Sequence, residues 1–230
     1  MEYPKQQPYT VQDLVNIIAI LRDPENGCPW DKVQTHQSIR MNFLEETYEA
    51  VDAIDLDDPT LLCEELGDVL MQVVFHTRIE EEAGRFSWAE VCDGVCRKLV
   101  LRHPNIFGPA AGFEGIKDWD ALKNREKGRV TPAQDLDSVP RALPALMRAA
   151  KLQKRAARYP ELAQPQTDGI DRAAEQLRQA EPGSEQARLA LGKLLFETVA
   201  LARKQGLDPE EALQQRNEAF ARQALPTTTD

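Results

Sequence analysis

Carboxylates stand in two short patterns that could bind divalent metal ions. Residues 45–49 read Glu-Glu-x-x-Glu, and residues 65–68 read Glu-x-x-Asp. Within each pattern, carboxylates three residues apart share one face of a helix. The four carboxylates at this spacing are Glu46, Glu49, Glu65 and Asp68. If the two helices pack antiparallel, these groups converge and repel one another, which raises their pKa values. One or two hard cations remove that cost, and Mg²⁺ suits carboxylates together with substrate phosphates.

Acidic residues at this spacing also occur on solvated helix faces and in di-iron bundles. A solvated acidic face is common, and it accounts for much of the net charge of −10. A di-iron bundle needs a Glu-x-x-His motif on two helices. No histidine follows any of the four carboxylates at that spacing. The residue types therefore favour Mg²⁺ over iron.

The elements that would position these carboxylates are all helices. Thr10 is a suitable N-cap for a first helix, and apolar residues recur at helical spacing in several later segments. These segments run over about 38–54, 60–82, 87–102 and 119–129. No segment alternates apolar and polar residues as a strand does. The sequence thus predicts an all-α protein.

The C-terminal half repeats the N-terminal half. Residues 66–74 (LGDVLMQVV) match residues 191–199 (LGKLLFETV), including the interior glycine. A duplicated helical module explains this match. We therefore predict a catalytic domain over 1–130, a linker over 131–139 and a second copy over 140–230.

The second copy has lost the acidic pattern. Residues 175–179 (EQLRQ) keep one carboxylate of three, and Ala190 and Lys193 stand where the first copy has Glu65 and Asp68. Lys193 would put a cation in the place of the metal. We expect this half to be structural or to stabilise a dimer.

Charge and composition argue against binding of duplex nucleic acid, a membrane span and secretion. Residues 1–139 hold 26 acidic and 14 basic residues, a net charge of −12 that would repel duplex nucleic acid. No run of eighteen apolar residues could span a membrane. The first ten residues lack the basic flank and apolar core of a secretory signal. The four cysteines lack the paired spacing of a zinc site, and they are compatible with a cytoplasmic protein.

At these residues the sequence resembles the MazG family of the all-α NTP pyrophosphohydrolase superfamily. The family signature, Glu-Glu-x-x-Glu followed by Glu-x-x-Asp, is matched in full by residues 45–49 and 65–68. Three further blocks are similar to the family, at residues 27–36 (GCPWDKVQTH), 102–108 (RHPNIFG) and 140–146 (PRALPAL). The last block resembles the connector between two tandem domains of the family.

The resemblance implies hydrolysis of a nucleoside or deoxynucleoside triphosphate to the monophosphate and pyrophosphate, with a role in removing aberrant or excess nucleotides. The implied cofactor is Mg²⁺, with Mn²⁺ as a substitute. Implied metal ligands are Glu46, Glu49, Glu65 and Asp68, with Glu45 assisting the water or a ligand. Implied substrate contacts are the basic pair Lys98 and Arg102 and the aromatic–lysine pair Trp119 and Lys123. Trp119 could equally be a packing anchor.

The expected architecture is a tandem of MazG-like helical bundles whose four-helix active site is completed by dimerisation. Short helical modules bury little alone, which favours a homodimer or a higher homo-oligomer. Two rival functions use the same residues. A non-catalytic nucleotide or metal sensor would bind without turnover, and a helical scaffold would tolerate neutral residues at the four carboxylate positions.

Overall fold

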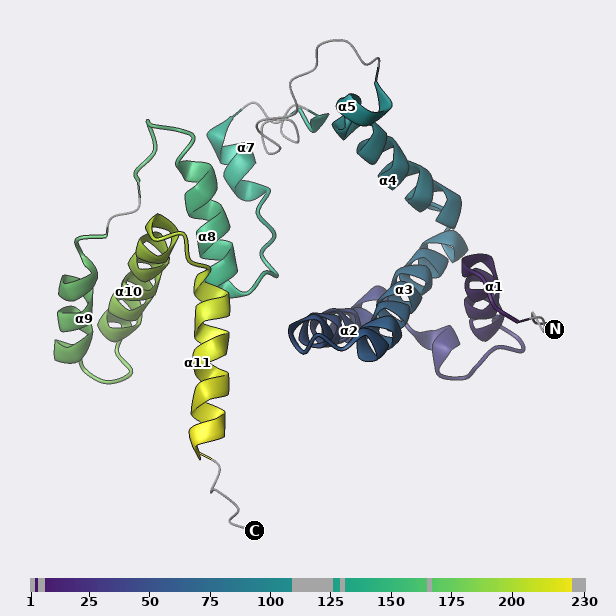
Figure 1. The fold of residues 1–230 in the computed structure, drawn as a ribbon, viewed down its shortest axis with the longest axis horizontal. Helices are drawn as coiled ribbons and strands as arrows, with labels where there is room; N and C mark the ends of the chain where they lie inside the picture. The colour runs from purple at the N-terminus through teal and green to yellow at the C-terminus, as the bar shows by residue number, and fades with distance from the viewer. Residues whose placement is uncertain (1–2, 4–6, 109–125, 129–130, 165–166, 225–230) are drawn as a thin grey trace. The chain divides into compact units, whose positions relative to one another are not determined.

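The computed structural model describes residues 3, 7–108, 126–128, 131–164 and 167–224, and within them every regular element is a helix (Figure 1). The expected all-α fold is confirmed. The first elements are α1 (Val11–Leu21), the 3₁₀ helix η1 (Asp31–Val33), α2 (His36–Asp55), α3 (Pro59–Glu82), α4 (Trp88–Arg102) and α5 (Pro104–Phe107). They are followed by α7 (Pro132–Asp137), α8 (Ala145–Ala156), α9 (Ile170–Gln179), α10 (Glu185–Lys204) and α11 (Pro209–Ala224). None of the described helices combines the length and apolar composition needed to cross a bilayer.

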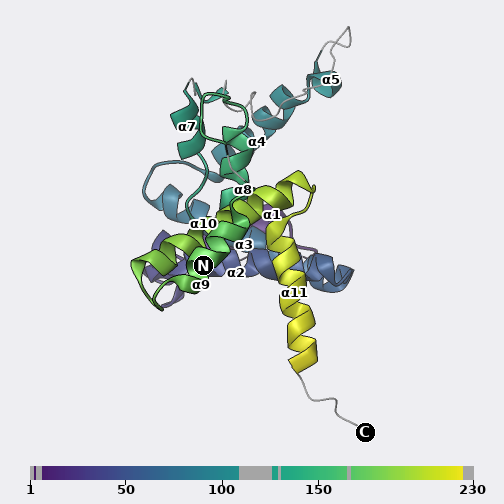
Figure 2. The same ribbon diagram turned by 90° about the vertical axis from the view of Figure 1, so that its left-hand side faces the viewer.

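The chain divides into two compact units, residues 1–117 (unit 1) and 118–230 (unit 2). In unit 1, α2 and α3 lie side by side as an antiparallel pair, and α1 and α4 pack on α3 (Figures 1 and 2). The core of this unit is formed by Ile18, Ile39, Val74 and Phe75. Burying these four side chains joins α1, α2 and α3, since each of those helices contributes at least one of them.

The turn between α2 and α3 is built by two aspartates. Asp57 has a positive φ of 53°, a conformation that Asp tolerates better than most residues. Asp58 is the N-cap of α3, and its side chain accepts hydrogen bonds from the backbone N–H groups of Thr60 and Leu61 at 2.9 and 3.1 Å. Pro59 occupies the first helical turn, where its missing N–H costs nothing. This short turn sets the register in which α3 returns along α2.

The first turn of α2 lies earlier than predicted. The helix begins at His36, because Thr35 and Ser38 cap each other's backbone N–H groups reciprocally. Thr10 caps α1 as expected, and Ser87 caps α4 through the same kind of box with Glu90. The two extra residues at the start of α2 bring His36 onto the helix, beside α3.

Arg22 ties the loop before α2 to the end of α3. Its side chain is only 4% exposed and makes two hydrogen bonds to the Glu82 carboxylate, at 2.8 and 3.0 Å. Its remaining nitrogen donates to the carbonyl oxygens of Asp31 and Gln34 at 2.6 and 3.1 Å. The guanidinium also lies 5.0 Å from the centroid of the Phe75 ring. One buried cation therefore holds both ends of the loop that leads into α2.

Residues 131–139, expected to be a linker, contain helix α7, which packs against α8 in unit 2. Asp135 on α7 is 1% exposed and faces cations from α8 and the residues just after it. Its carboxylate lies 3.3 Å from Arg155 and 3.4 Å from Arg158, and it accepts a hydrogen bond from the Tyr159 hydroxyl at 3.1 Å. These contacts make the segment part of the folded unit.

Candidate active site

Three carboxylates from α2 and α3 converge in unit 1. Glu46, Glu49 and Glu65 each offer an oxygen within 4.8 Å of the others. Glu46 and Glu65 are half-buried, whereas Glu49 is exposed. The aspartate-built turn places the third and fourth turns of α2 against the second turn of α3, which is why these residues meet. Oxygens on opposite sides of one Mg²⁺ lie about 4 Å apart, so this donor set fits a hard cation.

The site is electrostatically strained without a cation. Partial burial raises the pKa of Glu46, and the nearby charges of Asp68 and Glu49 raise it further. Burial likewise raises the pKa of Glu65, followed by the charges of Glu49, Asp68 and Glu64. Asp68 therefore lies close enough to act on both carboxylates, although it is not among the three that converge most tightly. A bound divalent cation would remove this repulsion.

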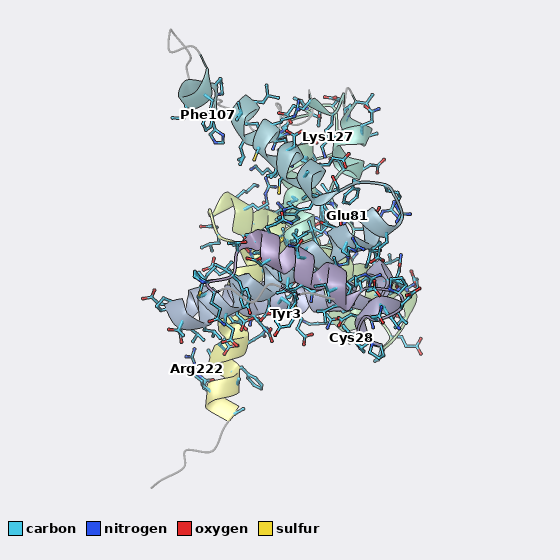
Figure 3. All side chains as sticks on the ribbon, turned by 90° about the vertical axis from the view of Figure 1, so that its right-hand side faces the viewer. Tyr3, Cys28, Glu81, Phe107, Lys127 and Arg222 are labelled. Carbon is cyan, nitrogen blue, oxygen red and sulfur yellow. The ribbon has the colours of Figure 1, made fainter. Side chains whose placement is uncertain are left out.

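The other predicted site residues are distributed differently. Glu45 is exposed and outside the tight group. Lys98 and Arg102 lie on the last two turns of α4, which extend away from the carboxylate end of α2 and α3 (Figures 1 and 2). Figure 3 shows Phe107, just beyond α4, well separated from Cys28 of the loop before α2. Helix α4, which carries this basic pair, makes its main contacts with α3 and α5 and not with α2. Trp119 and Lys123 lie outside the described residues.

A second polar cluster joins α2 and α3 about three helical turns away from the converging glutamates. The Nδ1 atoms of His36 and His76 are 2.7 Å apart, and His36 Nε2 lies 2.5 Å from a Glu80 oxygen. Arg85, in the turn after α3, donates to both oxygens of Glu80. Burial, followed by the His36 charge, lowers the pKa of His76. These contacts hold the first turn of α2 against α3.

Sequence reasoning missed the partners of His36. His76 and Glu80 are four residues apart on α3, which places them on one face of that helix. That spacing was the signal in the sequence from which their shared helix face could have been predicted. Nothing in the linear sequence pairs this face with the first residue of α2, because the pairing depends on the register set by the turn at Asp57 and Asp58.

Acid should weaken this cluster in a defined pH range. The hydrogen bond from Arg85, and then that from His36, lowers the pKa of Glu80 from 4.5 to about 2. A carboxylate whose pKa is lower in the folded state stabilises the protein fully above its unfolded value and loses that contribution below it. The contribution of Glu80 should therefore disappear between about pH 4.5 and pH 2.

The check is urea unfolding of wild type and Glu80→Gln at pH 6 and pH 3. We expect the drop in unfolding midpoint between these pH values to be smaller in the variant, because the amide has no proton to gain. Glu181→Gln, an exposed substitution in unit 2, should keep the wild-type drop. An equal drop in Glu80→Gln and wild type would contradict this role.

The corresponding helices of unit 2 form no such acidic group among the residues the structure describes. Glu175 on α9 is paired with Arg178 at 2.5 Å and with Gln179 at 2.7 Å. On α10, Lys193 lies 3.8 Å from the buried Glu197. The expected cation in place of Asp68 is thus engaged with a carboxylate of its own helix.

The sequence that contains this helix pair is similar to those of known proteins. The family model described as the MazG nucleotide pyrophosphohydrolase domain matches residues 34–107, which include α2, α3 and α4. A nucleoside triphosphate pyrophosphohydrolase of Escherichia coli K12 is 41% identical over 222 residues, which cover 92% of this chain and 84% of the relative. The nucleoside triphosphate pyrophosphohydrolase/pyrophosphatase MazG of Thermotoga maritima is 35% identical over 94% of this chain and 84% of its own length. The uncharacterized protein YabN of Bacillus subtilis is 39% identical over 90% of this chain and 44% of its own length.

Proposed function

Because the chain belongs to the MazG nucleotide pyrophosphohydrolase family, we propose that it hydrolyses nucleoside triphosphates to the monophosphate and pyrophosphate, using Mg²⁺ held by α2 and α3. The observation that carries this proposal is the convergence of Glu46, Glu49 and Glu65. Because the proposed substrates are nucleoside triphosphates, we place the enzyme in the cytoplasm, the compartment in which they would be met. Removal of aberrant or excess nucleotides is the role that this reaction would serve.

The carboxylates would act by holding the metal ion at a fixed position. Glu46, Glu49, Glu65 and Asp68 would bind the metal ion through oxygen atoms already oriented by the helix pair. When bound, Mg²⁺ would polarise the phosphate oxygens and lower the pKa of a coordinated water. Glu45, one residue before this set, would orient that water or a ligand.

Metal removal tests the proposal directly. Chelation by EDTA should abolish release of monophosphate and pyrophosphate, and added Mg²⁺ should restore it, with Mn²⁺ as a substitute. Mg²⁺ should also raise the melting temperature, because a ligand that binds only the folded state stabilises it. Full activity in excess EDTA, or a melting temperature indifferent to Mg²⁺, would contradict the metal assignment.

We further propose that the working site is a dimer of this chain. An apolar stripe on α2 is exposed in the single chain, formed by Met41, Leu44, Tyr48 and Val51, which are 41–59% exposed. Their spacing of three and four residues puts them on one helix face. A second copy packed on this stripe would exclude water from it and would complete a four-helix bundle. It would also be the source of Lys98 and Arg102, which one chain keeps away from its own carboxylates.

Charging the stripe should separate the subunits. Val51→Glu should give a monomer by analytical ultracentrifugation and should lose most hydrolysis, because a carboxylate cannot be buried unpaired in an apolar interface. Val33→Glu is the matched control, since Val33 is exposed on η1 and away from the stripe. A Val51→Glu protein that stays dimeric and active would place the interface elsewhere.

A further inference from the structure

A pocket of about 380 Å³ opens between α2 and α3, on the same helix pair as the carboxylates. It is lined by His36, Gln37, Arg40, Phe43 and His76. None of these residues takes part in the metal-dependent step proposed above. The pocket lies within unit 1, so its shape does not depend on the placement of unit 2.

The floor of the pocket is aromatic. Ionised Glu80 accepts a hydrogen from His36 Nε2, so His36 Nδ1 is left to accept the Nδ1–H of His76. In this arrangement the network fixes which nitrogen of each ring faces its partner. The two imidazole rings are nearly parallel, with an interplanar angle of 10°, and the Phe43 ring lies 5.5 Å from His76 at an inclination of 46°. The imidazole pair, with Phe43 inclined beside it, offers an aromatic surface on which a planar group can stack.

The rim of the pocket carries the guanidinium of Arg40. Among the described residues, Arg40 has no ion pair and no hydrogen bond, and its side chain is exposed. A guanidinium has only donors, so it pairs with acceptor atoms. In nucleic acids the commonest specific partner of arginine is the O6/N7 edge of guanine. An aromatic floor with an exposed arginine beside it is therefore suited to a base that carries a carbonyl oxygen.

One end of the pocket lies within a nucleoside's length of the carboxylates. On α2, Phe43 stands three residues and Arg40 six residues before Glu46. At 1.5 Å per residue, Arg40 is displaced by about 9 Å along the helix from Glu46. A triphosphate held by the carboxylates through Mg²⁺ could thus extend its base along the same helix pair into the pocket.

We propose that this pocket is the nucleobase subsite and that Arg40 selects 6-oxopurines, guanine and hypoxanthine, over adenine. The proposal rests on the function proposed above for the same helix pair. ITP and ATP are the informative substrates, because they differ at position 6 of the purine, where one has a carbonyl oxygen and the other an amino group.

The test compares kcat/KM for ITP, GTP and ATP in wild type and Arg40→Gln. We expect wild type to prefer ITP and GTP over ATP by about tenfold, the range of one good arginine–base contact. Arg40→Gln should lose that preference, with kcat/KM falling for ITP and GTP and changing little for ATP. Arg188→Gln, on the exposed face of α10, should keep the wild-type ratios.

The outcomes separate this proposal from the function on which it rests. Wild-type turnover with no preference between ITP and ATP, or a preference unchanged in Arg40→Gln, would overturn the subsite and leave the hydrolase standing. If wild type turns over no triphosphate, calorimetric affinities for ITP and ATP decide the subsite on their own, with tighter ITP binding through Arg40 supporting it and equal affinities overturning it. A change of oligomeric mass in Arg40→Gln without a change in base preference would assign the pocket to the subunit interface instead.

Discussion

Replacing Glu65 by glutamine should lower pyrophosphate release by about a thousandfold, the upper range for losing one electrostatic contact to a transition state. The amide keeps the size of the side chain but removes one of the charges that hold the metal ion. Glu65 is the only member of the tight group that comes from α3, so its loss should leave Asp68 as the remaining proposed ligand on that helix.

The same variant should be no less stable than wild type in the absence of metal. Burial and neighbouring carboxylates raise the pKa of Glu65, so its charge is less favourable in the folded than in the unfolded protein. A neutral side chain relieves that repulsion. We therefore expect the melting temperature without Mg²⁺ to be unchanged or higher, and the increase caused by Mg²⁺ to be lost.

The matched control is Glu64→Gln, an identical change at the adjacent, exposed position outside the converging group. It should keep wild-type activity and the Mg²⁺-dependent rise in melting temperature. Glu175→Gln in unit 2 should also be silent, because that carboxylate is already paired with Arg178. Loss of activity in Glu175→Gln together with an active Glu65→Gln would move the site to unit 2.

Replacing Arg22 by alanine should lower the free energy of unfolding by about 3 kcal/mol, the lower end of the range for breaking a buried ion pair. The change removes two hydrogen bonds to Glu82 and leaves the carbonyl oxygens of Asp31 and Gln34 without their donor. We expect the lower end because the Glu82 side chain is 31% exposed and can be solvated in part. Urea unfolding followed by circular dichroism measures the difference.

Arg78→Ala provides the comparison, since Arg78 binds the same carboxylate from the neighbouring turn of α3. Arg78 lies 3.1 Å from Glu82 but its side chain is 30% exposed, so its loss should cost about 0.5 kcal/mol. The two substitutions thus remove arginines that bind the same glutamate. The two arginines differ in burial, and only Arg22 also contacts the loop carbonyls. Equal losses in the two variants would show that burial and the loop contacts of Arg22 contribute little.

The features that could be predicted from the sequence are those that local spacing determines. The cap at Thr10 is a single residue next to an apolar periodic run, and the structure confirms it. Three of the four acidic site residues follow from carboxylates three apart on two helices joined by a short turn. In each case the physical cause lies within a few residues of the feature.

The features that could not be predicted depend on distant partners. Arg22 looks like an ordinary charged residue at a helix end, and it is buried only because Glu82, 60 residues later, returns to it. Helix α7 carried a local signal, a capping box between Thr131 and Gln134, although the sequence analysis predicted a linker there. Its burial also needs Arg155 and Arg158, which follow it by about twenty residues. We expect the approach of Lys98 and Arg102 to the carboxylates to need two chains, which one sequence does not show.

Measuring product release tests most directly whether unit 1, with Mg²⁺, removes pyrophosphate from nucleoside triphosphates. The measurement is release of monophosphate and pyrophosphate from a panel of NTPs and dNTPs with Mg²⁺, in wild type and in Glu49→Ala. We predict equal amounts of the two products from wild type and none from the variant. No turnover of any triphosphate by a folded wild-type protein that still binds nucleotide would contradict the proposed activity and identify a sensor.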